Sequence, residues 1–191
     1  ILLALFTVLG FSILDHRLLG SSWQMPADLM RFGIELPLML LGAWLTSSRY
    51  YGRFYPPALR LGAPVFVVAA AVTAASAADP ALIALGTARL VLTTFYVFFM
   101  IGLPFFAALR TNAFMVLAFG IAAWWLSMPL PVVLYNGFIL LCANLFAGVG
   151  SYALEHAMRL AFLERKLLAE VASHDGLTGL LNRAAFDAQL S

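Results

Sequence analysis

The chain has 191 residues, of which 63% are hydrophobic and only 10% are charged, and its mean hydropathy is +0.96. A water-soluble domain is roughly half apolar and a quarter charged, so this composition excludes one and indicates an integral membrane protein. The formal net charge is +2. We expect membrane lipid as a partner and no nucleic acid.

Long apolar runs, separated by short polar or proline-containing breaks such as "SSRYYGRFYPP", "ADP", "RTN" and "MPLP", predict an all-α membrane protein with a bundle of six transmembrane helices. The first run has about 14 apolar residues where a span needs ~20, so we expect that helix to have lost its start. No basic leader precedes it, which argues against a signal peptide. The last two spans are joined so closely that they must form an antiparallel hairpin. The six candidate spans are residues 1–14, 29–47, 59–78, 82–108, 112–128 and 131–153.

The distribution of Lys and Arg predicts the orientation of these spans, because short cytoplasmic loops carry an excess of both. If the end of the chain is cytoplasmic, the inner side holds most of the basic residues and the outer loops hold few. Both termini are therefore expected in the cytoplasm. The inner basic residues are Arg49, Arg53, Arg60, Arg110, Arg159, Arg165 and Lys166.

Charged residues inside a span are costly and mark candidate functional sites. The second span must include Arg31 and Glu35 to reach sufficient length, and these two residues are four apart, so they can pair on one helix face. Pro37 follows and cannot donate to the carbonyl of Gly33, which would free that carbonyl or kink the helix.

Arg89 interrupts another apolar run and has two interpretations. If the hydrocarbon part of that span is the ~20 residues ending near Leu109, Arg89 lies at the outer boundary and its side chain snorkels to the interface. Alternatively, Arg89 meets Glu35 in the outer half of the bundle and forms a charged pocket for a small extracytoplasmic ligand. Asn136 and Asn144, about two turns apart on the last span, add hydrogen-bonding groups to this candidate sensor pocket or hold helices together.

The last span and the segment after it are candidates for a homodimer interface. Small residues at the end of the span permit close helix contact and could form a dimer seam. Residues 154–174 then predict a cytoplasmic signalling helix with a seven-residue repeat interrupted at Glu164. This helix is either a parallel dimeric coiled coil or a solvated helix without a partner. The seam residues are Ala147, Gly148, Gly150 and Ser151, and the repeat residues are Leu154, Ala157, Ala161, Leu168 and Val171.

Histidine and cysteine give no indication of a metal or disulfide site. Cys142 is the single cysteine, and it lies within an apolar run. The histidines His16, His156 and His174 are scattered without helical spacing, so we expect no metal centre.

The polar stretch at residues 175–191 predicts a turn followed by a new helix. Gly176 and Gly179 break the incoming helix, and Asn182 suits the N-cap position, where its side chain would accept from the amide of Ala184 or Ala185. The pattern Asp-x-Leu-Thr-Gly-Leu-x-Asn-Arg-x-x-Phe resembles the entrance to the GGDEF domain of bacterial diguanylate cyclases. The matching positions are Asp175, Leu177, Thr178, Gly179, Leu180, Asn182, Arg183 and Phe186.

This resemblance implies three domains: a six-helix sensor (1–153), a signalling helix (154–174) and the truncated start of an α/β GGDEF domain (175–191). It also implies a parent protein of the bacterial inner membrane that joins two GTP molecules, with Mg²⁺, into cyclic di-GMP. The family's metal-binding and guanine-binding residues come later, so the fragment has no catalytic residue or cofactor. The resemblance also implies a coupling motif between the signalling helix and the catalytic domain, in which Asp175 pairs with Arg183. The alternative is that this pair is a solvent-exposed contact of little energetic weight. The motif residues are Asp175, Leu177, Thr178, Gly179, Asn182 and Arg183.

Two alternatives remain open. In the first, the GGDEF-like domain is degenerate or is followed by a cyclic di-GMP phosphodiesterase (EAL) domain. The membrane part would then be the sensor of a regulatory protein or of a phosphodiesterase. A six-span transporter is the weaker alternative, because polar residues are sparse and do not follow a path across the bilayer. The signal itself is not indicated by the sequence.

Overall fold

The computed structural model describes residues 2–18, 28–76, 80–173 and 182. Within these residues the regular elements are all helices and there is no strand, which confirms the all-α class. The chain divides into two compact units, Ile1–Ser151 and Tyr152–Ser191. The helices are α1 (Leu2–Leu18), the π-helix η1 (Arg31–Glu35), α3 (Leu36–Ser47), α4 (Tyr51–Ala75), α5 (Pro80–Phe99), α6 (Phe105–Trp125) and α7 (Leu130–Ser173).

Four helices in the described part of the chain are long and apolar enough to cross a membrane. This agrees with a multi-pass membrane protein. A shorter apolar helix covers Ile83–Phe99. The four long helices are Asp28–Ser47, which includes η1 and α3, Tyr51–Ala75, Phe105–Trp125 and Leu130–Ser173.

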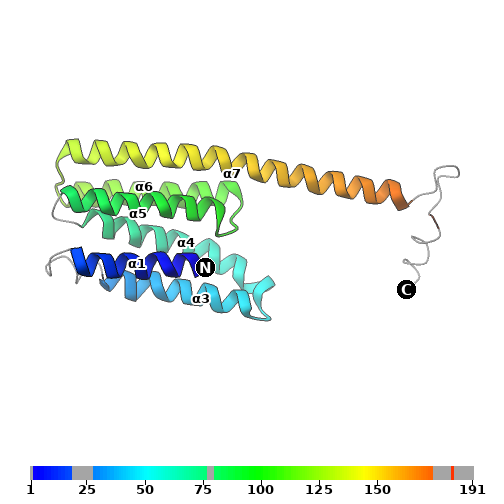
Figure 1. Ribbon diagram of the computed structural model, residues 1–191, viewed down its shortest axis with the longest axis horizontal. Coiled ribbons are helices and arrows are strands. Elements are labelled where there is room, and N and C mark those ends of the chain that lie inside the picture. Colours follow the sequence, from blue (N-terminus) through cyan, green and yellow to red (C-terminus); the bar gives the residue numbers. More distant parts are fainter. Residues whose placement is uncertain (1, 19–27, 77–79, 174–181, 183–191) are drawn as a thin grey trace. The chain divides into compact units, whose positions relative to one another are not determined.

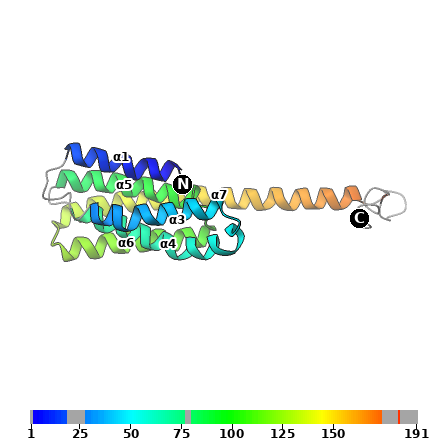
Figure 2. The same ribbon diagram turned by 90° about the horizontal axis from the view of Figure 1, so that it is seen from below.

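In the first unit, α4 is the central helix, and it contacts η1, α3, α5 and α6 (Figure 1). Alanines fill its buried face and allow the neighbouring helices to approach closely. α4 and α5 approach closely at Gly86, where an added Cβ atom would lie 2.9 Å from the Cα of Ala74. α1 contacts α3 and lies beside α5 (Figure 2). The buried alanines of α4 are Ala63, Ala69, Ala70, Ala71, Ala74 and Ala75.

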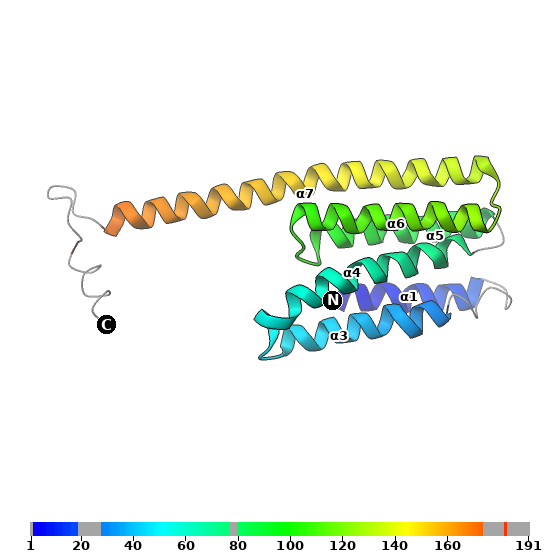
Figure 3. The ribbon, with the colours of Figure 1, turned by 180° about the vertical axis from the view of Figure 1, so that it is seen from behind.

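The predicted boundary between the spans at 82–108 and 112–128 is wrong. α5 ends at Phe99, and the turn comes before the predicted one, at residues 100–104, between α5 and α6 (Figure 3). This turn is made of apolar residues, so hydropathy does not reveal it. Gly102 supplies a φ of +80°, which glycine adopts without strain, and Pro104 precedes the first residue of α6. The predicted "RTN" break lies inside α6.

The predicted span 59–78 also begins too late, because α4 starts at Tyr51 and continues through Pro56 and Pro57. A proline inside a helix leaves the carbonyl four residues earlier without its helical donor. The carbonyls concerned belong to Gly52 and Arg53, and both residues are exposed. Solvent or lipid headgroups can bind them there, so the helix tolerates the two prolines.

α6 and α7 are antiparallel neighbours joined by residues 126–129, as the sequence predicts (Figure 1). Ser127 in this connection has a φ of 52°. In the second unit, the part of α7 after Ser151 is exposed along nearly its whole length.

Candidate functional site

Among the described residues of the first unit, three charged side chains are buried. Arg31 and Glu35 are each 1% exposed, and Arg89 is 7% exposed. Nη2 of Arg89 lies 3.6 Å from Oε1 of Glu35 and donates a hydrogen bond of 3.2 Å to the carbonyl oxygen of Ala70. The structure therefore brings Glu35 and Arg89 together, on helices that are far apart in the sequence.

Arg89 lies in the middle of its helix. It is the tenth residue of α5, which begins at Pro80, so it is ~13 Å along the axis from the helix start. The snorkelling interpretation required the span to extend to Leu109, but α5 ends at Phe99. With the corrected boundary and the low exposure of Arg89, that interpretation no longer has support.

Arg31 and Glu35 are the first and last residues of the π-helix η1, which α3 continues. The backbone N–H of Leu36 donates to the carbonyl of Arg31, five residues earlier, so the helix is one residue wider at this turn. Pro37 follows directly, and a proline ring clashes with the carbonyl four residues before it in a regular α-helix. Widening the turn relieves such a clash. π turns are rare in proteins as a whole, and many of those that occur are at functional sites.

A cavity of about 350 Å³ adjoins the ion pair. Its wall contains Glu35 and Arg89, and the remaining wall is mostly apolar and comes from α1, α3, α4 and α5. We call it the charged cavity. Oε1 of Glu35 is buried here and makes no hydrogen bond within the part of the chain that the structure describes. Its apolar and aromatic lining includes Val8, Phe11, Met39, Phe66, Phe95 and Phe99.

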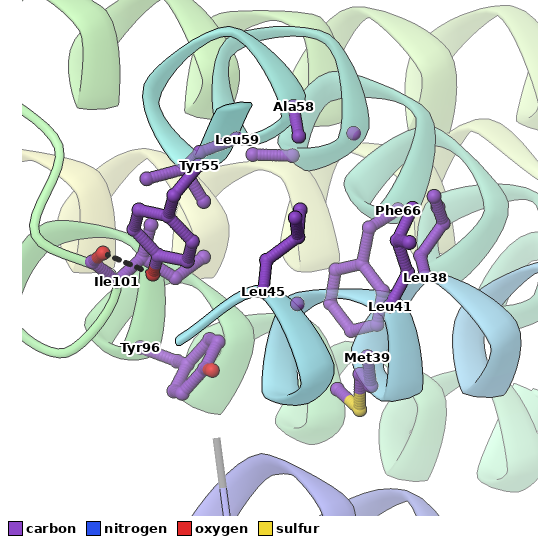
Figure 4. Close-up of a pocket in the computed structure, with 13 residues that line it drawn as sticks. Leu38, Met39, Leu41, Leu45, Tyr55, Ala58, Leu59, Phe66, Tyr96 and Ile101 are labelled. Carbon is purple, nitrogen blue, oxygen red and sulfur yellow. Dashed lines mark hydrogen bonds between the residues drawn. The ribbon is translucent and has the colours of Figure 1, made fainter. Parts of the chain in front are cut away.

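A second, smaller cavity of about 80 Å³ lies between α3 and α4 (Figure 4). Its lining has no charged residue. Met39, Phe66 and Tyr96 line both cavities. Figure 4 shows the hydroxyl of Tyr55 donating to the carbonyl of Ile101, at 3.4 Å, which connects α4 to the turn between α5 and α6. Movement of the shared side chains would therefore change both cavities.

The two candidate asparagines of α7 do not join the charged cavity. The side-chain amide of Asn136 donates to the carbonyl of Val132, and that of Asn144 donates to the carbonyl of Leu140, each at 2.8 Å. Both bonds are to the same helix four residues earlier. Neither asparagine is in the lining of the charged cavity, which is formed by described residues of α1, α3, α4 and α5 together with Glu35 of η1 and Met100.

The small residues near the end of the last span pack inside the chain. A Cβ atom on Gly148 would lie 3.6 Å from Phe98, and one on Gly150 would lie 3.2 Å from Phe99. Ser151 Oγ donates to the carbonyl of Phe98 at 3.2 Å. The face predicted as a dimer seam is thus occupied by α5 of the same chain. Because Phe99 also lines the charged cavity, this contact links the cavity wall to α7.

At the other end of α7, Asn182 of the coupling motif contacts the final turn of the helix. Its backbone N–H donates to the carbonyl of Ser173 at 2.8 Å, and its side-chain amide donates to the carbonyl of Ala172 at 2.6 Å. Asn182 therefore satisfies carbonyls that the helix end leaves open. Its predicted N-cap contacts lie outside the described residues, as do the remaining motif positions Asp175, Leu177, Thr178, Gly179 and Arg183.

Sequence reasoning missed Ala70, Tyr96 and Phe99 as parts of the site. The carbonyl of Ala70 has no sequence signal, because every residue has one. The two aromatic residues could have been placed by recognising Gly102 and Pro104 as a turn, since Phe99 would then be identified as the end of a helix.

Among the described residues, no group of three His, Cys, Asp or Glu side chains is arranged to hold a metal ion. Comparisons with protein-family models, with curated proteins and with solved structures found no match to this chain.

Proposed function

We propose that this chain is the membrane-embedded input region of a bacterial diguanylate cyclase, together with the entrance to its cytoplasmic GGDEF domain. In this proposal α1 and α5 cross the inner membrane with the four longer helices, and both termini are cytoplasmic. The observation that carries it is that α7 extends from an apolar span to Ser173, where Asn182 of the cyclase-like motif is hydrogen-bonded to its last turn.

The exposed side chains of α7 support a homodimer. Leu154, Leu168 and Val171, which belong to the predicted seven-residue repeat, are 46%, 68% and 67% exposed. A parallel partner helix would bury them. Because the small residues at 147–151 pack against α5, we place the intramembrane part of the dimer contact on the other, apolar face of α7. That face includes Leu141, Leu145 and Val149, which are exposed.

The route by which a signal reaches α7 is supported by the contacts of α5. Arg89 and Phe99 both line the charged cavity, and Phe99 also lies against Gly150. A ligand that prefers one arrangement of α5 would shift the population of that arrangement, and with it the position of α7. Two cytoplasmic domains held by a dimer of α7 would then approach differently, which controls the joining of two GTP molecules with Mg²⁺.

The test uses the full-length parent protein in detergent and measures cyclic di-GMP made from GTP and Mg²⁺. A chimera in which residues 1–153 are replaced by a strong dimeric coiled coil provides the constitutive control. We expect synthesis from the chimera and regulated synthesis from the intact protein. The cyclase proposal fails if neither produces cyclic di-GMP. Hydrolysis of added cyclic di-GMP would instead favour the phosphodiesterase alternative.

A further inference from the structure

We infer that the charged cavity binds a neutral, mostly apolar small molecule that carries a hydroxyl group. This inference names the signal of the proposed input region and in that sense rests on the proposed function. Binding itself can be measured without any cyclase output.

The size and lining of the cavity are those of a ligand site. Its volume of about 350 Å³ lies in the range of small-molecule pockets, which are mainly apolar with a few placed polar groups. Phe66, Phe95 and Phe99 contribute aromatic surface, and Val8 and Met39 contribute aliphatic surface. A mostly apolar ligand would therefore gain by transfer into it.

The Glu35 carboxylate in the cavity wall favours a ligand that donates a hydrogen bond. Oε1 of Glu35 is buried and lines the cavity, but within the described chain it has no hydrogen-bond donor. Its contact with Arg89 is 3.6 Å long, which exceeds hydrogen-bond distance. A buried acceptor without a donor is costly, so a ligand that donates to this oxygen is favoured.

The charges on the wall select against an ionised ligand. Glu35 and Arg89 already oppose each other, and the apolar surroundings screen charge poorly. An ammonium ligand would lie close to the Arg89 guanidinium, and a carboxylate would lie close to Glu35. Either ion would also lose its hydration on binding. A neutral hydroxyl group donates to Glu35 without adding a charge.

The position of the cavity suits a ligand that dissolves in the bilayer. Leu92 and Phe95 of its wall are apolar and are 51% and 41% exposed. In a membrane, exposed apolar side chains on a spanning helix are expected to contact hydrocarbon. A neutral amphipathic molecule concentrates in that layer, whereas an ion does not.

The experiment uses the 191-residue chain in lipid nanodiscs and a photoreactive probe, a benzyl alcohol that carries a trifluoromethyl diazirine. After illumination, peptide mass spectrometry locates the adducts. We expect labelling of the segments that contain Phe66 and Phe95–Phe99, with at least a fivefold decrease on adding excess benzyl alcohol and little decrease with toluene. Labelling of Trp124 and Trp125, each 78% exposed, serves as the lipid-facing reference and should not change.

Two variants test separately the hydrogen bond to Glu35 and the volume of the cavity. Glu35→Gln replaces the charged acceptor and should reduce cavity labelling at least fivefold relative to the tryptophan reference. Val8→Phe adds volume to the cavity wall on α1, leaves the ion pair in place, and should reduce labelling to a similar extent. If Glu35→Gln does not fold, Val8→Phe tests whether the probe binds in the cavity, and the competition experiment tests whether binding requires the hydroxyl group.

Equal competition by toluene would overturn the requirement for a hydroxyl group. Labelling of the cavity that is no stronger than that of the tryptophans, or that neither variant reduces, would overturn the site. These failures would leave the cyclase proposal standing, and absence of cyclic di-GMP synthesis would leave the binding result standing.

Discussion

The buried ion pair between Glu35 and Arg89 should be a major source of stability for the bundle, and a double-mutant cycle can measure this. We consider Glu35→Gln, Arg89→Gln and the combined variant. Each single substitution removes one charge of this buried contact and leaves the other facing a neutral amide, whereas the combined variant leaves two neutral amides. The side chains are 2% and 9% exposed, so solvent cannot compensate for the lost partner.

The expected magnitude follows from the distance and the burial. At 3.6 Å and an effective dielectric constant of about 20, the attraction between two unit charges is about 4.6 kcal/mol. Removal of one partner of a buried pair typically costs about 3–5 kcal/mol. We therefore expect each single variant to lower the free energy of unfolding by about 3–5 kcal/mol. The loss in the combined variant should be smaller than the sum of the two single losses, by about 1–3 kcal/mol.

The assay is reversible unfolding in mixed micelles with increasing SDS, followed by tryptophan fluorescence. The exposed pair Glu155–Arg159 in α7 is the matched control, because it is also a carboxylate–guanidinium contact but its side chains are 27% and 72% exposed. Its removal should cost only about 0.3–0.5 kcal/mol. If the two buried single variants each cost less than 1 kcal/mol and their effects are additive, the ion pair is not a structural element and the reasoning is wrong.

Three further predictions use the same bundle. Gly86→Ala should cost about 1–3 kcal/mol in that unfolding assay, because its Cβ would lie 2.9 Å from a backbone atom of α4, whereas Gly137→Ala, with no atom within 4 Å, should be neutral or stabilising. A similar loss in both would contradict the close approach. Asn182→Asp removes the amide donor at the end of α7, should cost about 1 kcal/mol and should speed amide hydrogen exchange in the last helical turn. Unchanged exchange would show that Asn182 does not hold the helix end. Gly150→Leu should displace α7 from the phenylalanine ring 3.2 Å from its Cβ position and change cyclic di-GMP synthesis by the full-length protein at least threefold, with Gly137→Leu as the control. Equal output from the two leucine variants would exclude this contact from signalling.

The features that depend on one segment at a time could be predicted from the sequence. Composition and the long apolar runs determined the all-α membrane class, since each span must satisfy its own backbone and contact lipid along its length. The short connection before Leu130 determined the α6–α7 hairpin. The change to charged residues after Ser151 indicated a different environment, and the compact units divide at that residue.

The features that depend on several segments were decided only by the tertiary structure. Hydropathy averages along the chain, so it could not show that Gly102 turns the chain within an apolar run, and this moved Arg89 from a helix end to a helix middle. Nor can sequence spacing show that α4 presents the carbonyl of Ala70 to Arg89, or that Gly150 packs on Phe99 of the same chain. The sequence by itself determined that charges are present in an apolar bundle. Packing decided which of them meet and that a cavity lies beside them, because contacts between helices depend on their relative rotation and depth.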